Sequence, residues 1–160
     1  MDLFSIFLWA ESSLLGEIGK NYGGVYATLG QSLHLTALAI LGGSVLVTDL
    51  RLLGVIMRDV SSEIVVDQAH RWFKVGLVLI IITGVFMAAA IAQRMYYSQF
   101  FWAKMIALAT GILFVFIIKR PLLKGSHDQI QPWVIKLTAA ASLMIWFTVA
   151  ATGRWIGFSG

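Results

Sequence analysis

The chain has 160 residues, of which 59% are hydrophobic and only 12% charged, whereas a soluble domain carries about 25% charged residues. Surface that faces lipid explains this excess of apolar residues, so the composition excludes an ordinary soluble domain and predicts one transmembrane domain over residues 1–160. The chain contains no cysteine, which excludes disulfides, thiolate metal ligands and iron–sulfur clusters. Its net charge of +4 is more typical of basic residues that orient a membrane protein than of nucleic-acid binding, which we do not expect.

The N-terminal segment predicts a helix that lies in the membrane interface. Apolar side chains recur at helical spacing over residues 3–19, around a polar strip that includes Glu11 and Glu17. Asp2 and the absence of a basic start are untypical of a cleaved signal peptide, so we expect the segment to be retained.

Four apolar segments are long enough to cross a bilayer as helices, at about residues 25–47, 73–92, 100–118 and 133–158. The predicted fold is therefore an all-α integral membrane four-helix bundle that carries an N-terminal interfacial amphipathic helix. Basic residues predict the orientation, because Lys and Arg are retained on the cytoplasmic side. They are concentrated around the first and third connections, so we expect both termini in the periplasm of a bacterial inner membrane.

Several strings in the sequence resemble a family of small four-span bacterial membrane proteins of unknown function, over most of the chain after Gly24. They are SLHLTALAILGG, TDLRLLG, FFWAKM and AASLMIWFTVAATGRWIGF. This resemblance implies a histidine in the first span, which here is His34. More distantly, a basic and aromatic start of a span, a Thr-Gly in its middle and a lysine in the third span are similar to the membrane domain of copper-resistance D proteins. That similarity implies metal handling on the periplasmic side.

His34 is the ionisable residue inside the first predicted span, about 15 Å from its outer end at 1.5 Å per residue. A polar side chain at that depth marks a candidate functional site. The alternative is a structural histidine whose ring is satisfied by Ser or Thr hydroxyls of neighbouring helices, for example Thr83. If the first two spans fold about a loop near Ser61, His34 faces Ile91, and His70 lies roughly 20 Å away.

This separation argues against a single haem held by both histidines. The leading hypothesis is nevertheless a haem-b protein for electron transfer, a redox carrier more than an enzyme, with His34 as axial ligand and Arg154 beside a propionate. Its partner would be a periplasmic or membrane redox protein. His70 could form a second, inner-side site with Arg71, Lys74 and His127, or these four residues could be interface anchors.

Three alternatives remain open from the sequence. Copper could be bound or transported by His34 with the thioethers of Met87 and Met144, although most methionines in such a chain fill gaps. The chain could instead be a non-catalytic accessory subunit of a larger membrane complex. A homodimer could supply a second His34 to one metal. Near the inner boundary, Lys136 is a possible partner of Asp49.

Overall fold

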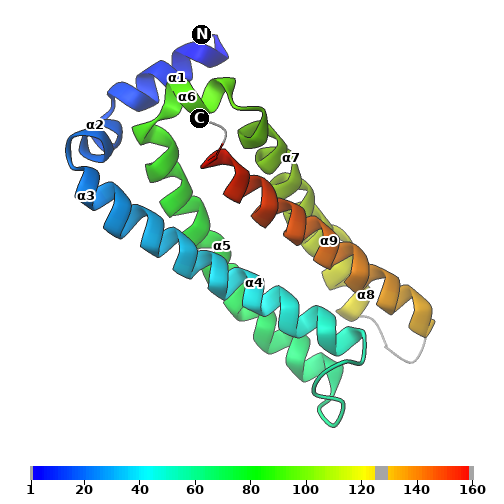
Figure 1. Ribbon diagram of the computed structural model, residues 1–160. Helices are drawn as coiled ribbons and strands as arrows, with labels where there is room; N and C mark the ends of the chain where they lie inside the picture. The colour runs from blue at the N-terminus through cyan, green and yellow to red at the C-terminus, as the bar shows by residue number, and fades with distance from the viewer. Residues whose placement is uncertain (1, 125–129, 159–160) are drawn as a thin grey trace.

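The computed structural model describes residues 2–124 and 130–158, with the side chains of all of these except residues 25–28 and 124. Every regular element in the described ranges is a helix (Figure 1). Four helical runs are long and apolar enough to cross a membrane, so the chain is a multi-pass, all-α membrane protein, as predicted. These runs cover Leu29–Leu52, Ser62–Ala90, Gln99–Leu123 and Pro132–Ile156.

The four spans are built from α-helices and two short π-helical segments. The first consists of η1 (Tyr26–Gln31) and α4 (Ser32–Leu52), preceded by α3 (Gly23–Val25); the second is α5 (Ser62–Ala90); the third consists of α7 (Gln99–Leu113), η2 (Phe114–Lys119) and α8 (Arg120–Lys124); the fourth is α9 (Pro132–Ile156). The helix of the second span begins at Ser62, eleven residues before the start predicted for the apolar segment. The Ser61 hydroxyl caps it, accepting a hydrogen bond from the Ile64 N–H at 3.4 Å.

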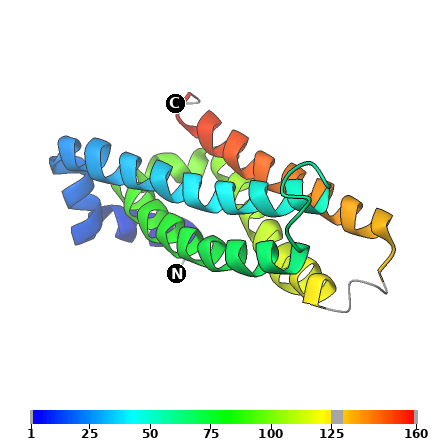
Figure 2. The ribbon, with the colours of Figure 1, turned by 90° about the horizontal axis from the view of Figure 1, so that it is seen from below.

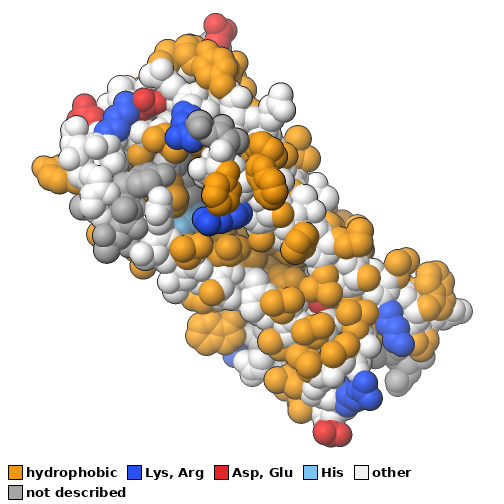
Figure 3. Space-filling model, viewed as in Figure 1, with side chains coloured by type: hydrophobic (Ala, Val, Ile, Leu, Met, Phe, Trp, Pro, Cys, Tyr) orange, Lys and Arg blue, Asp and Glu red, His pale blue; other side chains and the backbone are white. Residues whose placement is uncertain are grey.

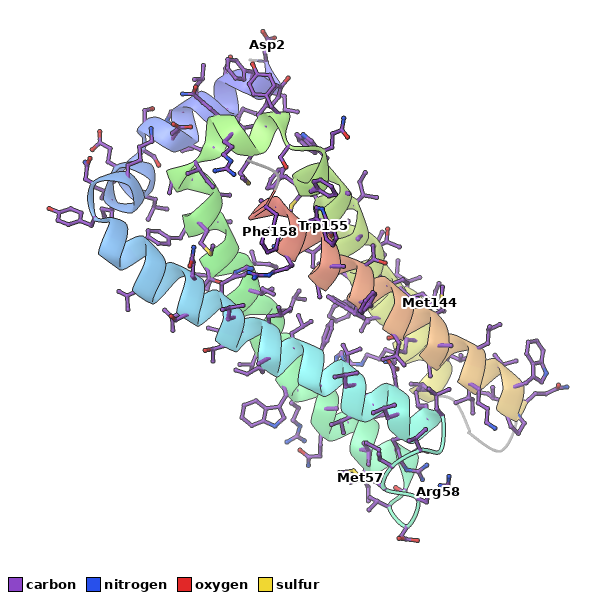
Figure 4. The ribbon with its side chains drawn as sticks, viewed as in Figure 1. Asp2, Met57, Arg58, Met144, Trp155 and Phe158 are labelled. Carbon is purple, nitrogen blue, oxygen red and sulfur yellow. The ribbon has the colours of Figure 1, made fainter. Side chains whose placement is uncertain are left out.

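The first and last described residues of the chain lie at the same end of the bundle. Asp2 and Phe158 lie at this terminal end, whereas Met57 and Arg58 lie in the connection at the opposite, loop end (Figure 4). The spans therefore run up and down in sequence order, which is the topology that four antiparallel spans with short connections produce.

The N-terminal segment forms two helices instead of the single helix predicted over residues 3–19. They are α1 (Leu3–Ser12) and α2 (Leu14–Asn21), and Ser13 between them is extended. Figure 1 shows α1 lying across the terminal end of the bundle beside α6 (Ala92–Tyr97). The rings of Phe4 and Phe7 pack on Tyr96 at centroid distances of 5.1 and 5.4 Å. This contact holds α1 roughly perpendicular to the spans, which is the orientation expected of an interfacial helix.

The bundle consists of two antiparallel hairpins, α4 with α5 and α7 with α9, which are joined mainly through α4 and α9 (Figure 2). Gly76 allows the closest approach in the first hairpin, because a Cβ at this position would lie 2.7 Å from the backbone nitrogen of Leu41. A layer of buried side chains crosses the middle of the bundle, and Leu41, Leu77 and Trp146 are among its members. Hydrophobic side chains also cover much of the outer surface between the two ends, whereas Lys and Arg gather towards the ends (Figure 3), as expected of a surface in contact with lipid.

Candidate functional site

A cavity of about 660 Å³ opens at the terminal end of the bundle, between the two hairpins. Its size falls within the range of about 300–1,000 Å³ that is typical of sites for small molecules and cofactors. Apolar side chains line its deeper part, where Leu38, Ile80 and Val149 belong to or pack on the buried middle layer. His34 lines the same cavity, and a histidine surface is visible beside basic side chains in a hollow of this region (Figure 3).

The imidazole of His34 is held by a hydroxyl of the neighbouring span. Its Nδ1 lies 2.8 Å from Thr83 Oγ1, and this hydroxyl donates its one proton to the carbonyl of Leu79 at 2.7 Å. The Thr83 oxygen must then accept a hydrogen bond from Nδ1–H, which assigns the proton of a neutral ring to Nδ1. Nε2 is left with its lone pair. The structural alternative, a histidine satisfied by Ser or Thr hydroxyls, therefore accounts for Nδ1 only. Nε2 keeps the unprotonated form that a metal ligand requires.

The sequence predicted that His34 faces Ile91, and this prediction was wrong. His34 lies opposite Thr83 and Gly84, eight residues nearer the loop end on α5. The error comes from the assumed turn near Ser61: the connection occupies residues 53–61, so the hairpin folds about its middle, near residue 57. His70 nevertheless remains far away, because the stretch of α5 from His70 to Thr83 spans about 20 Å at 1.5 Å per residue.

The terminal cavity is strongly basic. Its described lining contains no carboxylate but four cationic side chains: Lys20, Arg94, Lys104 and Arg154. Lys20 is neutralised by Glu11 at 2.5 Å, whereas the guanidinium of Arg154 lies 4.7 Å from the ring of Phe158. The side chain of Lys104 lies against Gly153 of α9, within electrostatic reach of His34. A cavity with this lining attracts anions.

Glu11 ties the N-terminal helices to the edge of this cavity. Besides Lys20, its carboxylate accepts a hydrogen bond from the backbone N–H of Gln93 at 2.6 Å. Burial raises the pKa of Glu11, but the bonds from Lys20 and Gln93 outweigh this effect and hold the pKa below its usual value. The carboxylate therefore joins α1 to α2 and to the start of α6.

The predicted methionines separate into two groups. Met87 lines the terminal cavity together with His34, and so does Met95. Met144 lies on the outer side of α9, with 70% of its surface exposed, and is absent from the cavity lining (Figure 4). The structure thus does not bring His34, Met87 and Met144 together within one chain. In the described residues, no group of three or more His, Cys, Asp and Glu side chains is arranged to hold a metal ion.

The predicted His70 site lies at the loop end, in a different setting from the one expected. His70 lines a second cavity together with acidic residues of its own helix and with Lys119 and Arg120 of the third span. Arg71 and Lys74 are exposed and do not line this cavity, and His127 lies outside the described residues.

A buried ion pair next to the second cavity was missed from the sequence. Lys119 binds the carboxylate of Asp49, and its ammonium also lies 3.2 Å from Ser142 Oγ. Both charged side chains are almost inaccessible, with 7% and 0% exposed. The predicted partner Lys136 is exposed instead. The available signal was the apolar run before Lys119, because a lysine at the end of a long span either extends to the interface or finds an acid inside.

The sequence matches a model of a family of unknown function, DUF6644, over residues 6–159. The chain belongs to this family. No curated protein and no solved structure matches it. The expected resemblance to small four-span proteins of unknown function agrees with membership of DUF6644, whereas no link to copper-resistance D proteins is shown. The function of this DUF6644 protein must therefore be inferred from its own cavities.

Proposed function

We propose that this protein binds haem b in the terminal cavity, with His34 as axial ligand, and serves in membrane electron transfer. The observation that carries the proposal is the pairing of an oriented imidazole with a basic, carboxylate-free cavity lining. Haem b would supply a one-electron iron couple there. The chain would supply the ligand, the counter-charges and the apolar walls.

The donor set suits an iron porphyrin. An axial histidine normally donates the N–H of its other ring nitrogen to an oxygen, which fixes the ring and raises its basicity, and Thr83 occupies that position for His34. Met87 lines the same cavity and is the candidate for a sixth ligand, since His/Met ligation is common in electron-transfer haems.

Charge and polarity also suit the two ends of haem b. Its propionates are anionic, and Arg94, Lys104 and Arg154 provide cations in the cavity lining. Its macrocycle is apolar and flat, and the deeper part of the cavity offers Leu38, Ile80 and Val149. An amphipathic dianion thus matches this cavity better than a neutral or cationic ligand does.

The copper alternative is weaker on the same grounds. A cuprous ion in the terminal cavity would meet uncompensated cations, which oppose its binding in a medium of low dielectric constant. One of its three proposed ligands, Met144, faces away from the cavity. A copper site would have to use His34 with Met87 and Met95, or a ligand from a second chain in a homodimer.

The test is the visible spectrum and metal content of protein purified from cells that make enough haem. We expect a Soret band that is lost in His34→Ala and retained in His70→Ala, the matched control. Thr83→Val should keep the band but change the midpoint potential, because it removes the acceptor that orients His34. A wild-type protein without a Soret band, or a band undiminished in His34→Ala, would refute the proposal. Stoichiometric copper without iron would favour the copper alternative.

A further inference from the structure

The loop-end cavity is a second built site that the haem proposal does not use. It has a volume of about 320 Å³ and lies between α4, α5 and the third span. Two separate groups of side chains line it. The apolar group consists of Val45, Val66, Ala69, Phe73, Val115 and Leu123; the polar group consists of Ser44, Thr48, Glu63, Asp67, His70, Lys119 and Arg120.

Buried polar groups of this cavity are held rigidly by the bundle. Lys119 has three N–H donors, of which the contacts with Asp49 and Ser142 engage two. The hydroxyls of Ser44 and Thr48 donate to carbonyls of their own helix at 2.7 and 2.8 Å, so they offer only lone pairs to the cavity. The site thus presents a fixed ammonium donor and fixed hydroxyl acceptors in an interior of low dielectric constant, where hydrogen bonds are strong.

The charges of the lining are divided between two walls. Glu63 and Asp67 lie on α5, whereas Lys119 and Arg120 lie at the junction of η2 and α8. A simple anion would be repelled by the first wall and a simple cation by the second. The arrangement suits a neutral ligand that accepts hydrogen bonds at one end and donates or releases protons at the other.

Aromatic rings favour a flat ligand. The imidazole of His70 stacks on Phe73 with an angle of 13° between the rings and 6.0 Å between their centroids. Phe116 contacts both rings edge-on, at 5.7 and 6.2 Å. Phe73 and His70 line the cavity, so a flat six-membered ring bound there would pack against them in the same offset or edge-on manner.

The cavity also lies where a lipid-dissolved molecule can reach it. α5 packs closely on α4 but makes little backbone contact with α7 and η2, so side chains fill the gap between the hairpins on this side. Phe116, which is 37% exposed, bridges that gap. Movement of one side chain, not of a helix, would admit a ring from the bilayer.

We propose that the loop-end cavity binds the head group of a membrane quinone or hydroquinone. One ring oxygen would accept a hydrogen bond from Lys119 or Arg120. In the hydroquinone, the hydroxyl across the ring would donate a hydrogen bond to the carboxylate of Asp67 on the opposite wall. This proposal depends on the loop-end cavity alone, whether or not the terminal cavity holds haem. A quinone is also the class of redox partner that a membrane electron carrier would have.

The experiment is a titration of purified protein in detergent with a short-chain benzoquinone and, separately, with its hydroquinone, each followed by quenching of tryptophan fluorescence. Trp146 packs on Phe73 at 5.4 Å, so a quinone in the cavity should quench it. The test variants are Asp67→Asn and Arg120→Gln, each of which removes one lining charge. The matched controls are Asp59→Asn and Arg71→Gln, whose side chains are exposed and do not line the cavity. Far-ultraviolet circular dichroism checks that each variant is folded.

We expect saturable binding of the quinone whose Kd rises about tenfold or more in Arg120→Gln, since a hydrogen bond from a charged group is lost, and stays unchanged in the controls. In Asp67→Asn the same rise is expected for the hydroquinone, because its hydroxyl is the donor to the Asp67 carboxylate. The same titration in His34→Ala separates the two proposals, because that variant should lose haem and keep quinone affinity. Unsaturable quenching, or equal Kd values in test and control variants, would overturn the inference. So would displacement of the quinone by one equivalent of phosphatidylethanolamine, whose zwitterionic head group would then be the ligand.

Discussion

The buried pair of Lys119 and Asp49 gives the sharpest prediction of stability. Replacing one partner leaves the other charge buried, which typically costs 3–5 kcal/mol, on the order of half the stability of a small domain. The position of Lys119 suggests a cost in this range, because 7% of its side chain and 0% of that of Asp49 are exposed. Lys119→Met and Asp49→Asn should therefore each destabilise the protein by about 3–5 kcal/mol. The double variant, which buries no charge, should lose only about 1–2 kcal/mol, because apolar packing often replaces such a pair at little cost.

The assay is reversible unfolding of the protein in mixed micelles, followed by far-ultraviolet circular dichroism. These values imply a coupling energy of at least about 4 kcal/mol between the two positions, well above the average of about 0.6 kcal/mol for a hydrogen bond between membrane helices. Lys136→Met serves as the control, since this exposed lysine of α9 should change stability by no more than about 0.5 kcal/mol. Additive single variants, or single losses below about 1 kcal/mol, would show that the pair is not buried as described.

Two further predictions concern helix packing and the N-terminal helices. Gly76→Ala should destabilise the bundle by about 1–3 kcal/mol in the same unfolding assay, because its Cβ would meet the backbone of Leu41 at 2.7 Å. The control is Gly42→Ala, which should be neutral because open space surrounds Gly42. Equal effects of the two substitutions would contradict this packing. The lowered pKa of Glu11 stabilises docking of α1 and α2 at neutral pH, and this contribution should disappear as the pH falls below the usual glutamate value of 4.5. Hydrogen exchange of α1 should show this loss of protection in the wild type and no pH-dependent step in Glu11→Gln.

The sequence predicted the four spans because length and hydropathy alone determine which segments can cross a bilayer. Boundaries were less certain where polar residues continue a helix beyond the apolar part, as they do at the start of α5. The spacing of apolar residues could not predict the break at Ser13, since apolar residues continue on both sides of it. His34 was found as a candidate because a deep imidazole is rare in a span.

The contacts of these side chains could not be predicted because they depend on the rotation of each helix about its axis. Lys119 and Lys136 both lie near the loop end, and only the rotation of the third span about its axis decides that Lys119 reaches Asp49 of α4 and Ser142 of α9. The same applies to Met87 and Met144, of which one lines the terminal cavity and the other faces outwards. Depth along the membrane normal follows from residue number, whereas the facing direction requires the neighbours.

The two cavities lie on opposite sides of the buried middle layer, and their linings differ in charge. The terminal cavity has cations without described carboxylates, whereas the loop-end cavity sets acids against bases. A short series of side chains connects the two cavities. Phe73 lines the loop-end cavity and packs on Trp146 of the middle layer. Trp146 lies one helical turn from Val149, which lines the terminal cavity. Sites about 20 Å apart with no shared partner respond to substitution independently. A haem loss in His34→Ala and a quinone loss in Arg120→Gln are therefore separate observations, and finding both would place two redox groups at different depths of one four-helix bundle.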